Sequence, residues 1–393
     1  MRYFSERPGT VSCSLWSAFC LIVFLLFACS GNRGSSSENK VSFADTVIFK
    51  AERLVIEREP GQTIVTIVNP WQGASDISNK YHLVPRGSSL PDGVDSSSAI
   101  FVPVRKIICM STTHIAMISA LGEDNSIAGV SGAGFIFSET LNRNIENRNI
   151  KDVGYEGSLN KEMILNISPD LIMMYGIGSE SAGYVGKIKE LGMKVLFNDD
   201  YLETDPLNKA EWIKLFGALY CKEKEADSIF RSEVEKYNEV KSFVSRNIKY
   251  RPKILLGLPY KDTWYVSPGN SFISKLTGDA GGDYIWKNTE SSVSMPYGIE
   301  NVYLGALNAD YWLNIGTVKD KKEISAVDER LTELPCFKKG FLYNNNKRVT
   351  AKGGNDYWES GSLYPHLILK DIASILHPDL FVGYELFYYR KIN

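Results

Sequence analysis

The stretch from residue 205 to residue 249 constrains the fold most, because its apolar residues recur at the three- and four-residue steps of an amphipathic helix. Thr204 or Asp205 can act as the N-cap, and Pro206 suits the first helical position, where its missing N–H costs nothing. We expect one long helix, or two helices with a break at 217–222. The part after the break would span roughly 40 Å, about the length of a small domain.

The sequence on either side of this helix follows one plan: aromatic residue, glutamate, short helix, aspartate, buried strand, glycine. Residues 155–162 and 296–300 supply the aromatic side chain and the glutamate, and residues 168–176 and 309–316 supply the aspartate, strand and glycine. The repetition predicts two α/β lobes of similar design. The alternative is that α/β proteins in general repeat such units.

Apolar runs at 104–110, 127–130 and 194–197 alternate with helical stretches in the first half, and runs at 253–258 and 311–315 do so in the second. Strand and helix alternating at this spacing predict right-handed βαβ units on parallel sheets. The fold class is therefore α/β, with two Rossmann-like lobes joined by a long linker helix. A small β-rich segment precedes them, because residues 41–104 alternate apolar and polar between turn residues, which predicts antiparallel strands.

The N-terminus carries a targeting pattern. An apolar run at 15–28 is too short to span a membrane but has the length of a signal-peptide core. Ala28 stands directly before Cys29, which resembles a bacterial lipoprotein signal. That resemblance implies a signal peptide at 1–28 and lipidation of Cys29; an uncleaved signal anchor is the alternative.

Composition and spacing give the remaining boundaries. We predict a flexible polar tether, a β-rich extension, an N-terminal lobe, a linker helix region and a C-terminal lobe, at 29–40, 41–104, 105–205, 206–249 and 250–393. The net charge of −2 offers no basic surface for a phosphate backbone, so nucleic acid is not an expected partner.

Ligands of open parallel sheets bind beyond the carboxyl ends of the strands, and the residues expected there are rich in Tyr and Trp. Such side chains suit a cleft that holds a large flat or amphipathic ligand; the alternative is that they fill the cores. The candidate ligand-binding residues are Ser111, Thr112, His114, Phe135, Tyr155, Tyr175, Tyr260, Trp264, Tyr297, Asp356, Tyr357 and Trp358.

Motifs for covalent or metal chemistry are missing from the sequence. It contains no Gly-x-Ser-x-Gly, His-Glu-x-x-His, phosphate-binding loop or Cys-x-x-Cys pattern, and its histidines are scattered. His114 stands at the predicted cleft and can ligate haem iron or a metal complex; a hydrogen-bonded histidine at a helix start is the alternative. We therefore predict no enzyme, no resident metal and no cofactor.

Taken in order, these pieces resemble the class III periplasmic substrate-binding proteins of ABC importers, in their iron-complex and cobalamin branch. The resemblance covers roughly residues 105–380, and its motifs lie at 111–114, 159–162, 168–172, 296–300 and 356–358. It implies a ligand that is a ferric siderophore, haem or cobalamin, captured between lobes that one rigid helix joins. It also implies that Glu162 and Glu300, one per lobe, bind arginine pockets on the permease dimer.

The sequence thus predicts a monomeric, lipid-anchored periplasmic protein that hands its ligand to an ABC permease, on the inner or the outer membrane. The extension at 41–104 exceeds the usual family start and is either a lineage-specific collar or a partner contact. A non-transport surface or assembly lipoprotein of the same fold is the alternative. An enzyme with a metallocluster between such lobes would need clustered cysteines, which Cys109, Cys221 and Cys336 do not supply.

Overall fold

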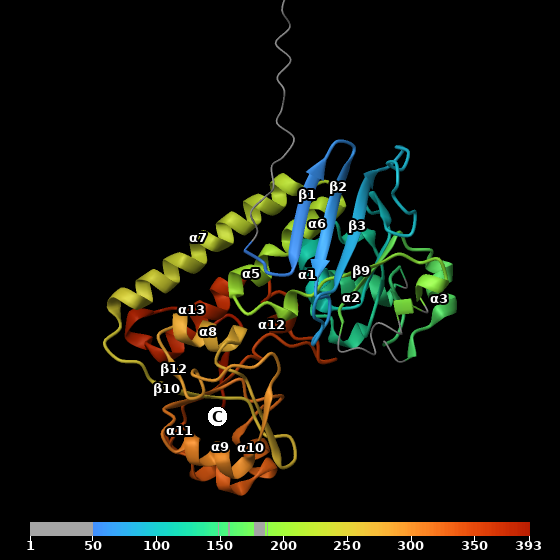
Figure 1. Cartoon of the computed structure of the whole chain (residues 1–393). Helices are drawn as coiled ribbons and strands as arrows, with labels where there is room; N and C mark the ends of the chain where they lie inside the picture. Colours follow the sequence, from blue (N-terminus) through green and yellow to red (C-terminus); the bar gives the residue numbers. More distant parts are fainter. Residues whose placement is uncertain (1–49, 148, 156–157, 177–184, 187) are drawn as a thin grey trace, which may run out of the picture. The chain divides into compact units, whose positions relative to one another are not determined.

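The computed structural model describes residues 50–147, 149–155, 158–176, 185–186 and 188–393. The predicted signal peptide, Cys29, the tether and the first residues of the extension lie outside these ranges. Figure 1 colours the chain from blue at the N-terminal strands to red at the C-terminal helix α13.

The N-terminal segment forms a four-stranded sheet in the order β1-β2-β3-β4. Its strands are β1 (Leu54–Glu59), β2 (Gln62–Val68), β3 (Ser78–Pro85) and β4 (Ala99–Val102). The first three pair antiparallel as predicted, whereas β3 and β4 pair parallel. Leu54, Val65 and Ile67 are fully buried and belong to the same core as the first lobe, so this segment is packed onto that lobe.

The N-terminal lobe contains an all-parallel sheet in the order β7-β6-β5-β8-β9, which confirms the predicted βαβ architecture. The strands are β5 (Ile107–Cys109), β6 (Ile127–Val130), β7 (Lys151–Asp152), β8 (Leu171–Met174) and β9 (Val195–Phe197). The helices that accompany them include α1 (Thr112–Ala120), α2 (Glu139–Glu146) and α3 (Lys161–Ile167), with 3-10 turns at Asp124–Ser126, Ala133–Phe135 and Asp200–Leu202.

The C-terminal lobe contains a sheet in the order β12-β10-β14-β15-β16, in which only β16 runs antiparallel among the described strands. Its strands are β10 (Lys253–Leu256), β12 (Asp283–Tyr284), β14 (Tyr311–Leu313), β15 (Leu342–Asn344) and β16 (Arg390–Lys391). A separate antiparallel pair joins β11 (Thr263–Val266) to β13 (Met295–Gly298).

Short helices complete this lobe. They are α8 (Phe272–Asp279), α9 (Ile299–Ala306), α10 (Lys321–Val327), α11 (Pro335–Lys339), α12 (Asp356–Glu359) and α13 (Pro365–Leu376), with 3-10 turns at Glu329–Glu333 and Pro378–Leu380.

The helical stretch between the lobes is interrupted at Trp212 and at Cys221, so it forms three helices where the sequence predicts one or two; the second interruption lies inside the predicted window. It comprises α5 (Pro206–Glu211), α6 (Ile213–Tyr220) and α7 (Glu223–Asn247). Asp205 caps α5 by accepting the N–H of Leu207 at 2.8 Å. The second interruption lies at Cys221, whose φ of 56° is left-handed and cannot continue a helix.

Helix α7 contributes to two cores. Ala226 and Phe230 are buried in the core of the N-terminal lobe, and Tyr237 and Val244 are buried in that of the C-terminal lobe. The apolar face of a single helix therefore packs against both lobes.

The close packing of α6 on α7 yields a stability prediction. A Cβ at Gly217 would lie 2.6 Å from the Cβ of Ala226, so Gly217→Ala is expected to destabilise the protein by about 1–3 kcal/mol. Gly278, in α8, has open space around its Cβ position. Gly278→Ala is therefore expected to leave stability unchanged or raise it by up to about 1 kcal/mol. Urea unfolding measures both changes, and equal midpoints for the two variants would contradict the packing described here.

Candidate functional site

Two chambers meet at Trp358 of α12. The larger has a volume of about 640 Å³ and the smaller about 340 Å³, and the Trp358 side chain lines both. This indole is 61% exposed, which is unusual for so large an apolar side chain. The tryptophan is thus placed to contact a ligand in either chamber.

The smaller chamber gathers residues that the sequence predicts as ligand contacts. They are Ser111, Thr112, Phe135, Tyr155, Tyr175 and Trp358. Phe135 and Tyr155 are more than half exposed and meet edge to face, with ring centroids 6.1 Å apart. Exposed rings of this kind offer apolar faces to a flat ligand without first having to leave a core.

The larger chamber has a different chemistry, because hydroxyl and amide side chains of the C-terminal lobe make up part of its wall. These include Ser267, Asn270, Ser292, Ser294 and Asn314. Tyr357 lines this chamber as predicted but is only 4% exposed. Sequence reasoning missed the serines; the Ser-rich stretch at 291–294 was the signal that could have found them.

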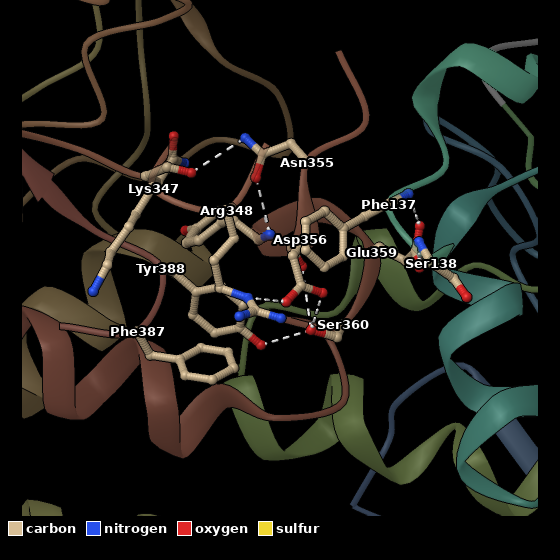
Figure 2. A network of polar contacts seen from close by, with 12 residues as sticks. Phe137, Ser138, Lys347, Arg348, Asn355, Asp356, Glu359, Ser360, Phe387 and Tyr388 are labelled. Atoms are coloured by element: carbon tan, nitrogen blue, oxygen red, sulfur yellow. Dashed lines mark hydrogen bonds and ion pairs between the residues drawn. The ribbon is translucent and has the colours of Figure 1, made fainter. Parts of the chain in front are cut away.

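Helix α12 is held to the N-terminal lobe by one carboxylate. Glu359 accepts the backbone N–H of Phe137 at 2.6 Å and that of Ser138 at 3.0 Å. Figure 2 shows the Glu359 side chain reaching these two groups. The carboxylate is 5% exposed. We call this contact the Glu359 clasp.

A second set of contacts holds α12 to the C-terminal lobe (Figure 2). Arg348 donates to Asp356 at 2.6 Å, and Ser360 links Asp356, at 2.7 Å, to the hydroxyl of Tyr388, at 2.8 Å. The guanidinium of Arg348 also lies over the ring of Phe137, 4.9 Å from its centroid. Asp356 is therefore a buried structural partner of Arg348, not an exposed group on the chamber wall.

Two further predicted residues lie in the core, not in the cleft. His114 is fully buried, burial lowers its pKa to about 3, and its ring nitrogens have no hydrogen-bond partner among the described residues. Trp264 is also fully buried and donates from its indole to the carbonyl of Leu256 at 3.0 Å. Neither residue is part of the lining of either chamber.

Tyr260 and Tyr297 line neither chamber. Trp264 pairs with Tyr297 in the β11–β13 pair, and Tyr260 lies just before β11. The prediction placed all three at the carboxyl ends of parallel strands, whereas β11 and β13 form their own small sheet.

Glu162 and Glu300 occupy equivalent positions, in the first turns of α3 and α9, and both are exposed. Their surroundings differ. Glu300 accepts from Arg330 at 3.2 Å, and Arg330 also pairs with Asp328 at 2.7 Å. A backbone hydrogen bond and the bond from Arg330 lower the pKa of Glu300, which therefore remains ionised.

The described residues include neither a cluster of metal ligands nor a membrane-spanning helix. Among those residues, no three His, Cys, Asp or Glu side chains gather as ligands for a metal ion. No helix there has both the length and the apolar character needed to cross a bilayer.

Residues 107–352 match the model of the family described as periplasmic binding protein. Two uncharacterized lipoproteins of Methanocaldococcus jannaschii are similar in sequence. One is 31% identical over 356 residues, which cover 83% of this chain and 81% of the relative; the other is 27% identical over 336 residues, which cover 81% and 82%.

Solved structures share the fold at low sequence identity. A periplasmic haem-binding protein from Pseudomonas aeruginosa is 12% identical with a TM-score of 0.55, covering 74% of this chain and 98% of that one. A protein of an Fe³⁺-hydroxamate transport system from Saccharomonospora viridis is 16% identical with a TM-score of 0.52, covering 70% and 94%. An ABC transporter substrate-binding protein from Listeria monocytogenes is 17% identical with a TM-score of 0.52, covering 70% and 99%.

The Glu359 clasp generates a pH prediction. Burial, as the main cause, raises the pKa of Glu359 from 4.5 to about 7. A carboxyl with a higher pKa in the folded state stabilises the fold below the unfolded value, and this contribution is lost as pH rises through the folded value. Between pH 4.5 and about 8, the wild type should therefore lose about 3 kcal/mol relative to Glu359→Gln.

Urea unfolding of both proteins at several pH values measures this difference. Glu333→Gln, which changes an exposed carboxylate paired with Lys338, is the control and should follow the wild type. If the curve for Glu359→Gln also runs parallel to the wild type, the buried carboxyl does not titrate in this range.

Proposed function

Because the chain belongs to the periplasmic binding protein family, we propose that it captures an iron complex or a corrinoid in its cleft and delivers it to an ABC permease. The family is one of binding proteins, so the chain binds a substrate and is not an enzyme. The observation that carries the proposal is the convergence of exposed aromatic and hydroxyl side chains around Trp358.

The candidate ligands are a ferric siderophore, haem and cobalamin. Structures with this fold include a haem-binding protein and a protein of an iron-hydroxamate transport system, which supports the iron complexes. The smaller chamber, walled by rings and hydroxyls, suits a flat or macrocyclic body that stacks on aromatic faces. We propose Ser111, Thr112, Phe135, Tyr155, Tyr175, Tyr357 and Trp358 as the contacts.

We propose lipidation of Cys29 as the membrane anchor. The two Methanocaldococcus jannaschii relatives are named as lipoproteins, which supports this reading of the N-terminal pattern. The mature protein would then work at a membrane surface, next to its permease.

The test is a titration of a soluble form that starts after Cys29 with haemin, cobalamin and a panel of ferric siderophores, followed by absorbance and tryptophan fluorescence. Saturable binding at micromolar concentration or below supports the proposal and identifies the ligand. Silence across the whole panel would instead favour a surface or assembly lipoprotein.

Trp358 is expected to be the main anchor in this site. Trp358→Ala should weaken binding of the identified ligand by about 1–3 kcal/mol, because it removes a large exposed ring that both chambers share. The same titration measures the loss. Tyr260→Ala is the matched control: this ring is 67% exposed but lines neither chamber, so affinity should not change. Equal affinities for all three proteins would move the site elsewhere.

Glu162 and Glu300 are proposed to dock the two lobes on the permease. The double variant Glu162→Ala with Glu300→Ala should bind ligand as the wild type does and fail to support uptake, since both carboxylates lie outside the two chambers. Uptake of labelled ligand by cells, paired with a solution titration, separates the two steps. Glu333→Ala, exposed on the same lobe as Glu300, should transport normally. Weakened binding in solution would refute a docking role.

A further inference from the structure

Two buried carboxylates, Glu203 of the first lobe and Glu211 of α5, hold the N-terminal β segment in place. Glu211 accepts the N–H groups of Lys50 and Ala51 at 2.8 and 2.9 Å. Glu203 accepts those of residues 52–53 at 3.2 and 3.3 Å. Four consecutive backbone donors are thus satisfied by side chains about 150 residues away in sequence. Bonds from backbone donors to buried carboxylates are strong, so this part of the segment has a fixed position.

The loop after β2 is packed just as closely and reaches the opposite side of the larger chamber. A Cβ at Gly176 would lie 2.6 Å from the Cβ of Trp71, so the loop leaves no space against the end of β8. The next residue, Gln72, donates to the carbonyl of Ser292 in the C-terminal lobe at 3.3 Å. Glu52, Arg53, Gln72 and Gly73 all line this chamber. The N-terminal β segment therefore forms one wall of the larger chamber, although it precedes the family match at 107–352.

The two chambers differ in the number of charged side chains on their walls. Among the described residues, the smaller chamber has no charged side chain, and the larger has Glu52, Arg53 and Glu203. Glu203 already accepts two backbone N–H groups and the indole N–H of Trp212, at 3.2 Å. Arg53 is thus the one cation on the described walls.

The guanidinium of Arg53 is held in place and keeps donors to spare. Its Nη1 donates to the carbonyl of Asn69 at 2.7 Å, and a guanidinium carries five N–H donors in all. Asp199, a buried acid that interacts electrostatically with Arg53, does not cancel its charge at neutral pH, because burial raises the pKa of Asp199 to about 8. The side chain is partly exposed at the chamber wall.

We propose that Arg53 binds an anionic oxygen of the ligand, a carboxylate, phosphate or sulfonate, and that the N-terminal β segment is thereby part of the ligand site. This rests on the proposed binding function but not on which complex is bound. A planar guanidinium with remaining N–H donors matches the geometry of an oxyanion, and hydrogen bonds between charged groups are stronger than neutral ones.

Two fluorescent probes test the assignment without knowledge of the natural ligand. They are 8-anilinonaphthalene-1-sulfonate and N-phenyl-1-naphthylamine. The two probes share one aromatic framework, and only the first carries a sulfonate. Arg53→Gln should raise the dissociation constant of the sulfonate about tenfold and leave that of the neutral amine unchanged. Arg58→Gln, on the exposed part of strand β1, which begins directly after Arg53, should change neither.

Three results would overturn the assignment: unchanged sulfonate affinity in Arg53→Gln, an equal loss for both probes, or no saturable sulfonate binding by the wild type. Unfolding midpoints of the variants check that the fold is kept. The probes also separate this proposal from the proposed function. If Arg53→Gln loses affinity for the sulfonate alone, and the wild type binds no member of the iron and cobalamin panel, the anion site stands and the iron-complex function is rejected. If Arg53→Gln binds a ligand of the panel as the wild type does, and its affinity for the sulfonate is also unchanged, the iron-complex function stands and the anion site is rejected.

Discussion

The shared helix α7 is the constraint on which the two-lobed arrangement depends. Phe230 packs in one core and Tyr237 in the other, so the lobes are joined by a continuous hydrogen-bonded helix of 25 residues, roughly 37 Å long. Between these rings, the buried Glu233 accepts the backbone N–H of His366 at 2.9 Å and so holds α13 against α7. A helix held along its whole length bends little, which favours small movements of the lobes when a ligand enters.

A second connection between the lobes runs through α12. Glu359 attaches this short helix to the N-terminal lobe, and the Arg348 network attaches it to the C-terminal lobe. Trp358 lies between these two attachments. A ligand that stacks on this indole therefore contacts an element that both lobes hold. The buried Glu359 carboxyl, unlike the apolar packing of α7, can respond to pH, so the two connections need not respond alike to solution conditions.

Local signals in the sequence predicted local structure well. The cap at Asp205, the break near Cys221 and the parallel strands follow from short-range patterns and were confirmed. Positions that depend on distant pairing were missed. Trp264 was assigned to the cleft because its strand was expected in the main sheet, yet it lies in the core. Nothing near Arg53 in the sequence shows that Glu203 will hold its backbone beside the cleft.

The two chambers together restrict the ligand more than either does alone. The smaller chamber offers rings and hydroxyls without charge, and the larger offers serine and asparagine side chains, the carboxylates of Glu52 and Glu203, and Arg53 as its one described cation. Removing an anion from water is costly unless it is paired, and each further unpaired anion adds to that cost. A complex with several negative charges would therefore bind poorly against the described walls. An amphipathic ligand, with an apolar body, neutral hydrogen-bonding groups and one anionic oxygen near Arg53, satisfies both chambers at once.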